Sequence, residues 1–399
     1  MIKGRDIIIV GQQPWDVTIG SNCKNIAIEF SKHNRVLYVN SPLDRITAIK
    51  KKSDPAIQKR IKVIKGKENG LLVIENNLWN LYPNKMVESI NWINNQRIFE
   101  FFNHLNNKKF AKCILEAIEL LEFTNIILFN DNDIFKSFYL KEMLLPTTSI
   151  YYSRDYMLFV DYWKKHGKKL EPELIAKSNI CLANSSYMAN YCKQYNPNSY
   201  NIGQGCDIDE FSNLKELIIP KDIQSLNKPI IGYVGALIGL RLNISILLGI
   251  AKSKPNWNIV LVGPEDEAFK ESELHHISNV YFLGSKPSND LPRYINSFDV
   301  CVNPQILSQV TVGNYPRKID EYLAMGKPVV ATNTPFMEEV FSEHTYLGQT
   351  TEDFIFLINK ALVENNSDLI EARKAFASTH SWENNVLKIY DRIKQFENS

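Results

Sequence analysis

The feature that most constrains the fold is a recurrence of short apolar runs, separated by segments of helical length and period. The runs are rich in β-branched and aromatic residues and are too short to be buried helices. In parallel sheets, helices cover both faces of the strands, so each strand has a continuous apolar sequence of this kind. The sequence therefore predicts an α/β protein with parallel sheets, whose strands lie at 7–10, 36–39, 126–129, 150–152, 180–183, 230–234, 259–262, 280–283, 300–302 and 329–331.

The length of 399 residues predicts two domains of roughly 150–200 residues, because one compact core rarely grows larger. The weakest stretch, 212–229, is polar and separates the two series of strands, so we expect the linker there. The predicted domains are therefore 1–211 and 230–380. The tail 381–399 places an apolar stripe on one helix face and needs a surface to cover it; the stripe consists of Val386, Ile389, Tyr390, Ile393 and Phe396.

Composition excludes several classes of protein. The net charge of +2 and the charged share of 23% do not indicate a nucleic-acid or strongly acidic partner. No apolar run approaches the ~20 residues of a membrane span, and the run at 7–10 is too short for a signal peptide. The six cysteines form no C-x-x-C pair, so reduced, buried thiols are expected. These observations predict a cytoplasmic protein.

The stretch 315–332 holds the most informative local pattern. Pro316 predicts the start of a helix, Lys318 and Glu321 share one of its faces, and Gly326 ends it before a buried strand. The free N–H groups of such a helix, together with Arg317 and Lys318, suit a diphosphate. The Glu321 carboxylate, one turn in, suits the diol of a ribose. An i,i+3 ion pair on a solvated face is the alternative for Lys318 and Glu321.

This stretch resembles the donor-binding helix of GT-B glycosyltransferases, especially the family 4-like enzymes that use nucleotide sugars. The likeness is nearly continuous from Pro229 to Thr332, in the segments 230–237, 260–264, 279–284 and 291–300. The resemblance implies two doubly wound Rossmann-like domains with a cleft between them, and a C-terminal helix (381–399) that crosses back onto the first domain. It assigns the acceptor to 1–211 and the nucleotide sugar to 230–380.

Two departures from the family pattern affect the predicted donor site. Where family 4 enzymes carry Gly-Arg-Leu and then a lysine, this chain has Gly235-Ala-Leu and Arg241, which can still grip a phosphate. A solvated helix face is an equal alternative for Arg241. A second glutamate of the family is replaced by Gly313. Backbone N–H groups from Thr311 through Gly313 to Asn314 are predicted to hold the sugar or phosphate instead. The pattern is similar to a teichuronic-acid-type and capsule-type subgroup.

In the first domain, Gly20 and Ser21 precede a helix and correspond to a family loop whose N–H groups face the donor diphosphate. The alternative is a plain N-cap turn. Asp155 follows a predicted strand, where it would orient the acceptor hydroxyl or act as a base; an ion pair with Arg154 or an N-cap is the equal alternative. His166 lies in an aromatic and cationic segment and is a second catalytic candidate, although a lone histidine is more often structural.

Residues 45–67 contain nine Lys and Arg residues and one acidic residue. Trp79 and Trp92 lie farther along the chain. Cations beside exposed aromatics suit an anionic membrane, at about 1 kcal/mol per cation. A solvated loop with buried tryptophans is the alternative, and an acidic polysaccharide would also suit the charge. We therefore predict a cytoplasmic location with peripheral contact to the inner face of the membrane.

Together these patterns predict a bacterial hexosyltransferase for cell-surface polysaccharide synthesis. It would move a sugar from a nucleotide-diphosphate donor to a glycan or lipid-linked glycan, without a metal or other cofactor, because cations and helix dipoles can neutralise the leaving group. Retention of the anomeric configuration is implied by the resemblance alone. The alternatives are a non-catalytic GT-B subunit that binds nucleotide or a partner, and a nucleotide-sugar 2-epimerase.

Overall fold

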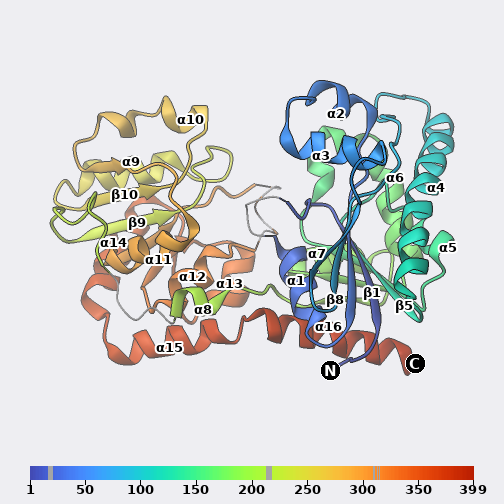
Figure 1. Ribbon diagram of the computed structural model, residues 1–399. Helices are drawn as coiled ribbons and strands as arrows, with labels where there is room; N and C mark the ends of the chain where they lie inside the picture. The colour runs from blue at the N-terminus through green and yellow to red at the C-terminus, as the bar shows by residue number, and fades with distance from the viewer. Residues whose placement is uncertain (17–20, 213–217, 309–310, 312, 314) are drawn as a thin grey trace. The chain divides into compact units, whose positions relative to one another are not determined.

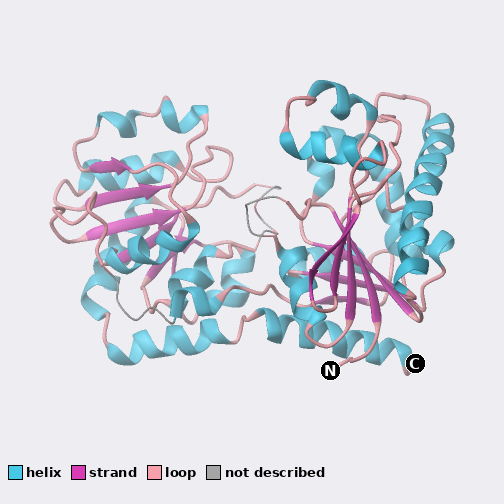
Figure 2. Ribbon diagram, in the orientation of Figure 1, coloured by secondary structure: helices cyan, strands magenta, loops and turns pink. Residues whose placement is uncertain are grey.

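The computed structural model describes the whole chain except residues 17–20, 213–217, 309–310, 312 and 314. The chain forms two compact α/β units, each with a sheet between helices (Figure 1, Figure 2). The first unit comprises Met1–Gly203 and Trp382–Ser399, and the second comprises Gln204–Ser381.

The boundary lies a few residues earlier than the sequence suggests. The sequence pattern predicts that residues 204–211 belong to the first domain, but in the structure they belong to the second unit. The Cys206 N–H donates to the His380 carbonyl at 2.8 Å, and helix α8 (Ile208–Ser212) packs against α12 (Lys318–Ala324). These contacts, which a linear pattern does not reveal, tie the segment to the second unit.

The described residues of the first unit form an eight-stranded sheet in the order β3-β4-β2-β1-β5-β6-β7-β8. Neighbouring strands are parallel except β3 and β4, which form an antiparallel hairpin at one edge. The strands are β1 (Asp6–Gly11), β2 (Arg35–Asn40), β3 (Leu71–Glu75), β4 (Leu78–Leu81), β5 (Ile126–Asp131), β6 (Thr148–Ser153), β7 (Ile180–Ala183) and β8 (Ser199–Asn201).

Alternate residues of β1 feed two separate cores. Ile7 and Ile9 pack with α1 (Asn22–Ser31), whereas Ile8 and Val10 pack with α4 (Gln96–Leu121) on the other face. This follows from the two-residue period of a strand, and it explains why the run is apolar throughout. The remaining helices of the unit are α2 (Arg45–Lys50), α3 (Pro55–Ile64), α5 (Leu140–Leu144), α6 (Asp161–Lys177) and α7 (Ser186–Lys193).

The C-terminal helix α16 (Trp382–Glu397) is part of the first unit, where it packs against α1 (Figure 1). Its apolar stripe joins the α1 core: Val386, Ile389, Tyr390 and Ile393 are buried there, and Phe396 is partly buried. The return of the tail to the first unit is therefore confirmed.

In the second unit, the described residues form a six-stranded parallel sheet in the order β11-β10-β9-β12-β13-β14. The strands are β9 (Ile230–Val234), β10 (Asn258–Val262), β11 (Val280–Phe282), β12 (Val300–Asn303), β13 (Val329–Thr332) and β14 (Tyr346–Gly348). The helices beyond α8 and α12 are α9 (Ile244–Ser253), α10 (Glu267–Lys270), α11 (Leu291–Ser297), α13 (Pro335–Phe341), α14 (Thr351–Glu364) and α15 (Ser367–Ser378).

Both sheets have a topological switch point. In the first, β1 lies between β2 and β5; in the second, β9 lies between β10 and β12. Crossovers leave these central strands in opposite directions, and ligands of doubly wound sheets bind beyond the carboxyl ends of the strands there. The fold therefore offers one ligand-binding edge in each unit.

All six cysteines are buried free thiols. Of the helices in the described part of the chain, none is both long and apolar enough to cross a membrane.

Candidate functional site

Two glycines shape the carboxyl edge of the second sheet. Gly235 follows β9 with φ +140°, and Gly263 follows β10 with φ +151°. A Cβ on Gly263 would lie 2.0 Å from the Gly235 carbonyl oxygen, so only glycine permits the two turns to touch. The close approach keeps the edge of the sheet open to a ligand.

Lys318, at the start of α12, lies at this edge. Its ammonium donates to the Tyr233 hydroxyl and sits 4.1 Å from the centre of the Tyr233 ring. A Cβ on Gly235 would lie 2.7 Å from Lys318 Nζ. The structure thus brings together Gly235 and Lys318, two of the predicted donor-binding residues.

Helix α12 differs from the prediction at its start. Its seven residues begin at Lys318 rather than at Pro316, since Pro316 and Arg317 form the turn before it. The Tyr322 hydroxyl accepts from the Val234 N–H at 2.8 Å and thereby fixes the helix to β9. In so short a helix, the charge offered to a phosphate comes from the Lys318 ammonium more than from the helix dipole.

Arg317 and Glu321 form a pair one turn along the helix. Arg317 Nε donates to Glu321 Oε1 at 3.2 Å, and the Glu321 side chain is only 12% exposed. Burial raises the pKa of the Glu321 carboxyl, and the charges of Arg317 and Lys318 oppose that rise. The alternative of a Lys318–Glu321 ion pair is therefore not observed; Glu321 pairs with Arg317 instead, which occupies the guanidinium that was expected to contact phosphate.

A cluster of polar side chains around the buried Asp320 supports α12. Asp320 Oδ1 lies 2.7 Å from His380 Nδ1, and Asp320 Oδ2 accepts from the Tyr315 hydroxyl at 2.6 Å. Burial raises the pKa of Asp320, and the contact with His380 opposes the rise. These contacts hold the turn that carries Arg317 and Lys318.

The other predicted donor residues of the second unit are less closely grouped. Thr311 is buried and its hydroxyl accepts from the Ser308 N–H at 3.0 Å; Gly313 is also buried. Asn314 lies outside the described residues. Arg241 is exposed in the turn before α9. Its assignment to phosphate remains a prediction.

In the first unit, Ser21 occupies the N-cap position of α1, and Gly20 lies outside the described residues. Ser21 is buried, yet its hydroxyl neither caps the helix nor has another partner in the described structure. Ser21 therefore takes the N-cap position of a plain turn without a side-chain cap. Its role toward the donor stays a prediction.

Asp155 follows β6 and belongs to an ion-pair cluster. Arg154 donates to Asp155 Oδ2 at 2.9 Å and to the buried Asp131 Oδ1 at 2.8 Å. Burial works against the guanidinium charge, but the two carboxylates outweigh it and raise the pKa of Arg154. The Asp155 side chain is 46% exposed, so it is paired and still accessible to a ligand. Both sequence interpretations of Asp155 are thus compatible with its position.

His166 is held within the core of the first unit. Nδ1 lies 2.8 Å from Gln96 Oε1, Nε2 lies 2.9 Å from the Ile93 carbonyl oxygen, and the ring stacks on Phe99 at 3.6 Å. Burial lowers the pKa of the imidazole. Because both ring nitrogens have protein partners, the contacts describe a structural role rather than the predicted catalytic one.

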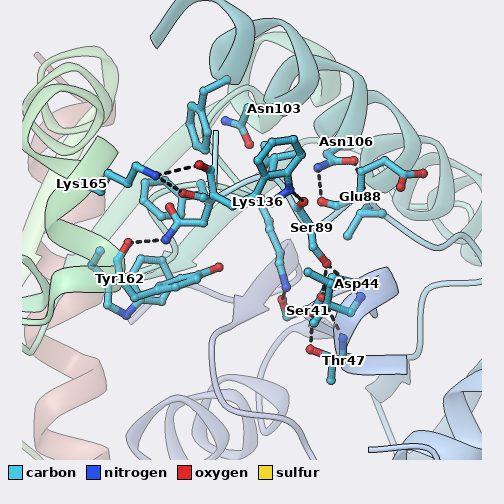
Figure 3. Close-up of a pocket in the computed structure, with 18 of the residues that line it drawn as sticks. Ser41, Asp44, Thr47, Glu88, Ser89, Asn103, Asn106, Lys136, Tyr162 and Lys165 are labelled. Atoms are coloured by element: carbon cyan, nitrogen blue, oxygen red, sulfur yellow. Dashed lines mark hydrogen bonds between the residues drawn. The ribbon is translucent and has the colours of Figure 1, made fainter. Parts of the chain in front are cut away.

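A cavity of about 760 Å³ lies at the carboxyl edge of the first sheet (Figure 3). Gln12, Ser41 and Asp133, which follow β1, β2 and β5, line it, so it coincides with the switch point. Gln12 Oε1 also lies 3.5 Å from Arg154 Nη2, which places the Asp155 cluster beside the cavity. The size is that of small-ligand sites.

Comparison with known proteins relates the second unit to a known family. Residues 228–371 match the model of the family described as glycosyl transferases group 1. This part of the chain is similar to a group 1 glycosyl transferase domain, and the chain as a whole has the GT-B fold of its structural neighbours. The matched residues include Gly235, Lys318 and Glu321, which the sequence predicts to bind a donor.

Similarity to known proteins extends beyond residues 228–371. TuaH of Bacillus subtilis (strain 168), named for teichuronic acid biosynthesis as a glycosyltransferase, is 26% identical over 237 residues, which are 56% of this chain and 59% of that protein. Anabaena HepE, solved with UDP and glucose, has a TM-score of 0.65 and 14% identity over 98% of this chain and 100% of its own. Sucrose-phosphate synthase from Thermosynechococcus elongatus has a TM-score of 0.67 and 14% identity, over 99% of this chain and 100% of its own.

Three residues at this edge of the second sheet were not singled out from the sequence: Tyr233, Gly263 and Tyr322. Tyr233 and Gly263 lie in the segments 230–237 and 260–264, which resemble the family. Their contacts with Lys318 and Gly235 join different strands and helices. In the described residues, no group of three or more His, Cys, Asp and Glu is arranged to hold a metal ion.

Proposed function

We propose that the chain is a glycosyltransferase that moves a sugar from a nucleoside-diphosphate donor to a hydroxyl of a glycan or lipid-linked glycan, in the synthesis of a cell-surface polysaccharide. The observation that carries the proposal is the Lys318 ammonium at the Gly235 turn, with the Glu321 carboxylate one helical turn away. The spacing suits a diphosphate on Lys318 and a ribose diol on Glu321.

The relatives support this choice of substrate. HepE was solved with UDP and with UDP-glucose, and the name of TuaH refers to teichuronic acid, a cell-surface polymer. UDP-sugars are therefore the first donors to test. In the proposed reaction the acceptor oxygen bonds to the anomeric carbon, the bond from that carbon to the diphosphate breaks, and the hydroxyl proton passes to a general base. Lys318 neutralises the leaving diphosphate, so we propose that no metal is required.

A thermal-shift panel of nucleotide sugars tests donor binding. A true donor at 100 times its Kd should stabilise the protein by about 2.7 kcal/mol. The corresponding free monosaccharides serve as controls and should leave the melting temperature unchanged. If no nucleotide or nucleotide sugar stabilises the chain, the donor assignment is wrong.

We also propose that the basic segment 45–67 contacts an anionic membrane. The structure reduces the cations available for this contact, because Arg45, Arg60 and Lys62 pair with Glu88, Asp16 and Glu68. Lys50, Lys51 and Lys52 are exposed at the end of α2 and have no ion pair in the described residues, and Ile49 beside them is 70% exposed. Free cations around an exposed aliphatic side chain suit a bilayer surface.

Charge reversal of Lys50, Lys51 and Lys52 to glutamate should release the protein from anionic vesicles. Three reversals remove about 3 kcal/mol of attraction and add repulsion. Cosedimentation of the wild type should also fall as salt rises, because the field is screened over ~8 Å at physiological ionic strength. The matched control reverses Lys360, Lys374 and Lys394, which lie on other helices. Failure of the wild type to bind anionic vesicles at low salt would contradict this proposal.

A further inference from the structure

The aromatic wall of the first-unit cavity is its most distinctive feature. Phe135 stacks on Trp163 with ring centres 5.1 Å apart, Tyr162 meets Trp163 edge to face at 5.1 Å, and Trp92 is 72% exposed at the cavity. Flat, amphipathic rings pack well against the C–H faces of a pyranose, and their polar atoms stay hydrated. The wall therefore favours a ring-shaped ligand with both apolar and polar surface.

Two amide groups of the lining have unused hydrogen-bonding capacity. Asn103 is only 2% exposed, and its Nδ2 has no partner in the described structure. Asn91 donates through Nδ2 to the Tyr162 carbonyl at 2.9 Å, but its Oδ1 has no partner there. Buried polar atoms are seldom left unpaired in native proteins. One spare donor and one spare acceptor suit hydroxyl groups, which can accept from the first and donate to the second.

The charges of the lining favour an uncharged ligand. Asp44, Glu88, Asp133 and Asp161 line the cavity, against Lys136 and Lys165. Both lysines are already engaged: Lys136 Nζ donates to Ser41 Oγ at 2.8 Å, and Lys165 Nζ donates to the Asn91 carbonyl at 2.8 Å. Figure 3 shows the Asp44 contacts on one side of the cavity and Lys165 with Tyr162 on the other.

At least two of the carboxyl groups carry their charge near neutral pH. Arg45, with Lys109, lowers the pKa of Glu88 to about 2. Burial disfavours the Asp44 charge, but hydrogen bonds from Ser89 and Thr47 outweigh it and lower its pKa. A ligand carboxylate would thus enter a lining in which four carboxyl groups face two ammonium groups, at a cost that low polarity increases.

We propose that this cavity binds an uncharged pyranose ring of the acceptor glycan and rejects a uronic acid at the same position. The inference rests on the proposed function, because it names the sugar class that the acceptor presents. The ring lies on the wall of Trp92, Tyr162 and Trp163, and its hydroxyls pair with Asn103 and Asn91. The neighbouring Asp155 cluster is then close to the bound sugar.

The experiment compares methyl β-D-glucopyranoside with methyl β-D-glucuronide, which differ only at the sixth carbon. Binding to the full-length protein is measured by saturation-transfer NMR. We expect the glucoside to bind and the glucuronide to bind at least ~10-fold more weakly at pH 7. Trp92→Ala should weaken glucoside binding at least ~5-fold, because it removes part of the wall. Phe356→Ala, an equally exposed aromatic of the second unit, is the matched control and should change nothing.

Asp161→Lys tests the charge argument separately. Asp161 is exposed at the start of α6, so its replacement should not disturb the core, and it should narrow the gap between the two glycosides. Equal or tighter binding of the glucuronide to the wild type would overturn the selectivity. Absence of glucoside binding, with nucleotide-induced stabilisation intact, would overturn the sugar site and leave the proposed function standing. Loss of both would refute the two together.

Discussion

Gly263→Ala is expected to destabilise the second unit by at least about 2 kcal/mol and to abolish the stabilisation by a nucleotide sugar. The added methyl group would lie 2.0 Å from the Gly235 carbonyl oxygen, and a φ of +151° is itself unfavourable for alanine. Because that oxygen belongs to backbone, the whole Gly235 turn must move away. Thermal unfolding followed by circular dichroism, with hydrogen exchange to locate the transition in 204–381, measures the effect.

Gly284→Ala is the matched control for this effect on stability. Gly284 also has a positive φ, +67°, but no atom lies within 4 Å of its added Cβ. It should cost only the conformational term, ~1 kcal/mol. Equal destabilisation by the two substitutions would show that the close contact between the turns after β9 and β10 does not shape the site.

Lys318→Ala and Glu321→Ala should weaken nucleotide binding in different ways. Each removes a charged partner, worth at least about 1.5 kcal/mol, or more than tenfold in affinity. Lys318→Ala should weaken a nucleoside diphosphate and spare the nucleoside, since Lys318 is assigned to phosphate. Glu321→Ala should weaken both, because the ribose is common to them. Calorimetry with UDP and uridine, or with the pair that the panel selects, provides the comparison.

Lys360→Ala is the charge-matched control. It removes a lysine from an exposed ion pair with Glu364 on α14 and should leave both affinities unchanged. Unchanged affinity for the diphosphate in a folded Lys318→Ala protein would refute the phosphate assignment. An effect of Glu321→Ala on the diphosphate alone would instead place Glu321 near the phosphates.

Most of the fold follows from buried apolar runs. Each of the ten predicted strands corresponds to an observed strand, because a parallel strand covered on both faces has a nearly unbroken apolar sequence. The strands β3, β4, β8 and β14 were missed. β8 and β14 are three residues long, and most of β3 is exposed at the edge of its sheet. Such strands form through pairing with a neighbour, which leaves little periodicity in the chain.

The candidate site was predictable only where its residues lie close together in the sequence. The pattern at 315–326 identified Lys318 and Glu321, and the family turn identified Gly235. The Lys318–Tyr233 contact and the Tyr322–Val234 hydrogen bond join different elements, so no local spacing encodes them. The sequence left the role of His166 open, because its contacts with Phe99 and Gln96 join α6 to α4 and no local spacing encodes them.

The most direct test of glycosyl transfer is the release of nucleoside diphosphate from a panel of nucleotide sugars, with and without a glycan acceptor. The account predicts release from at least one donor, faster release when an acceptor is present, and a loss of ~100-fold in Lys318→Ala. Two results would contradict it. A nucleotide sugar that binds and is never cleaved would indicate a non-catalytic subunit, and conversion of the donor to its epimer would indicate an epimerase.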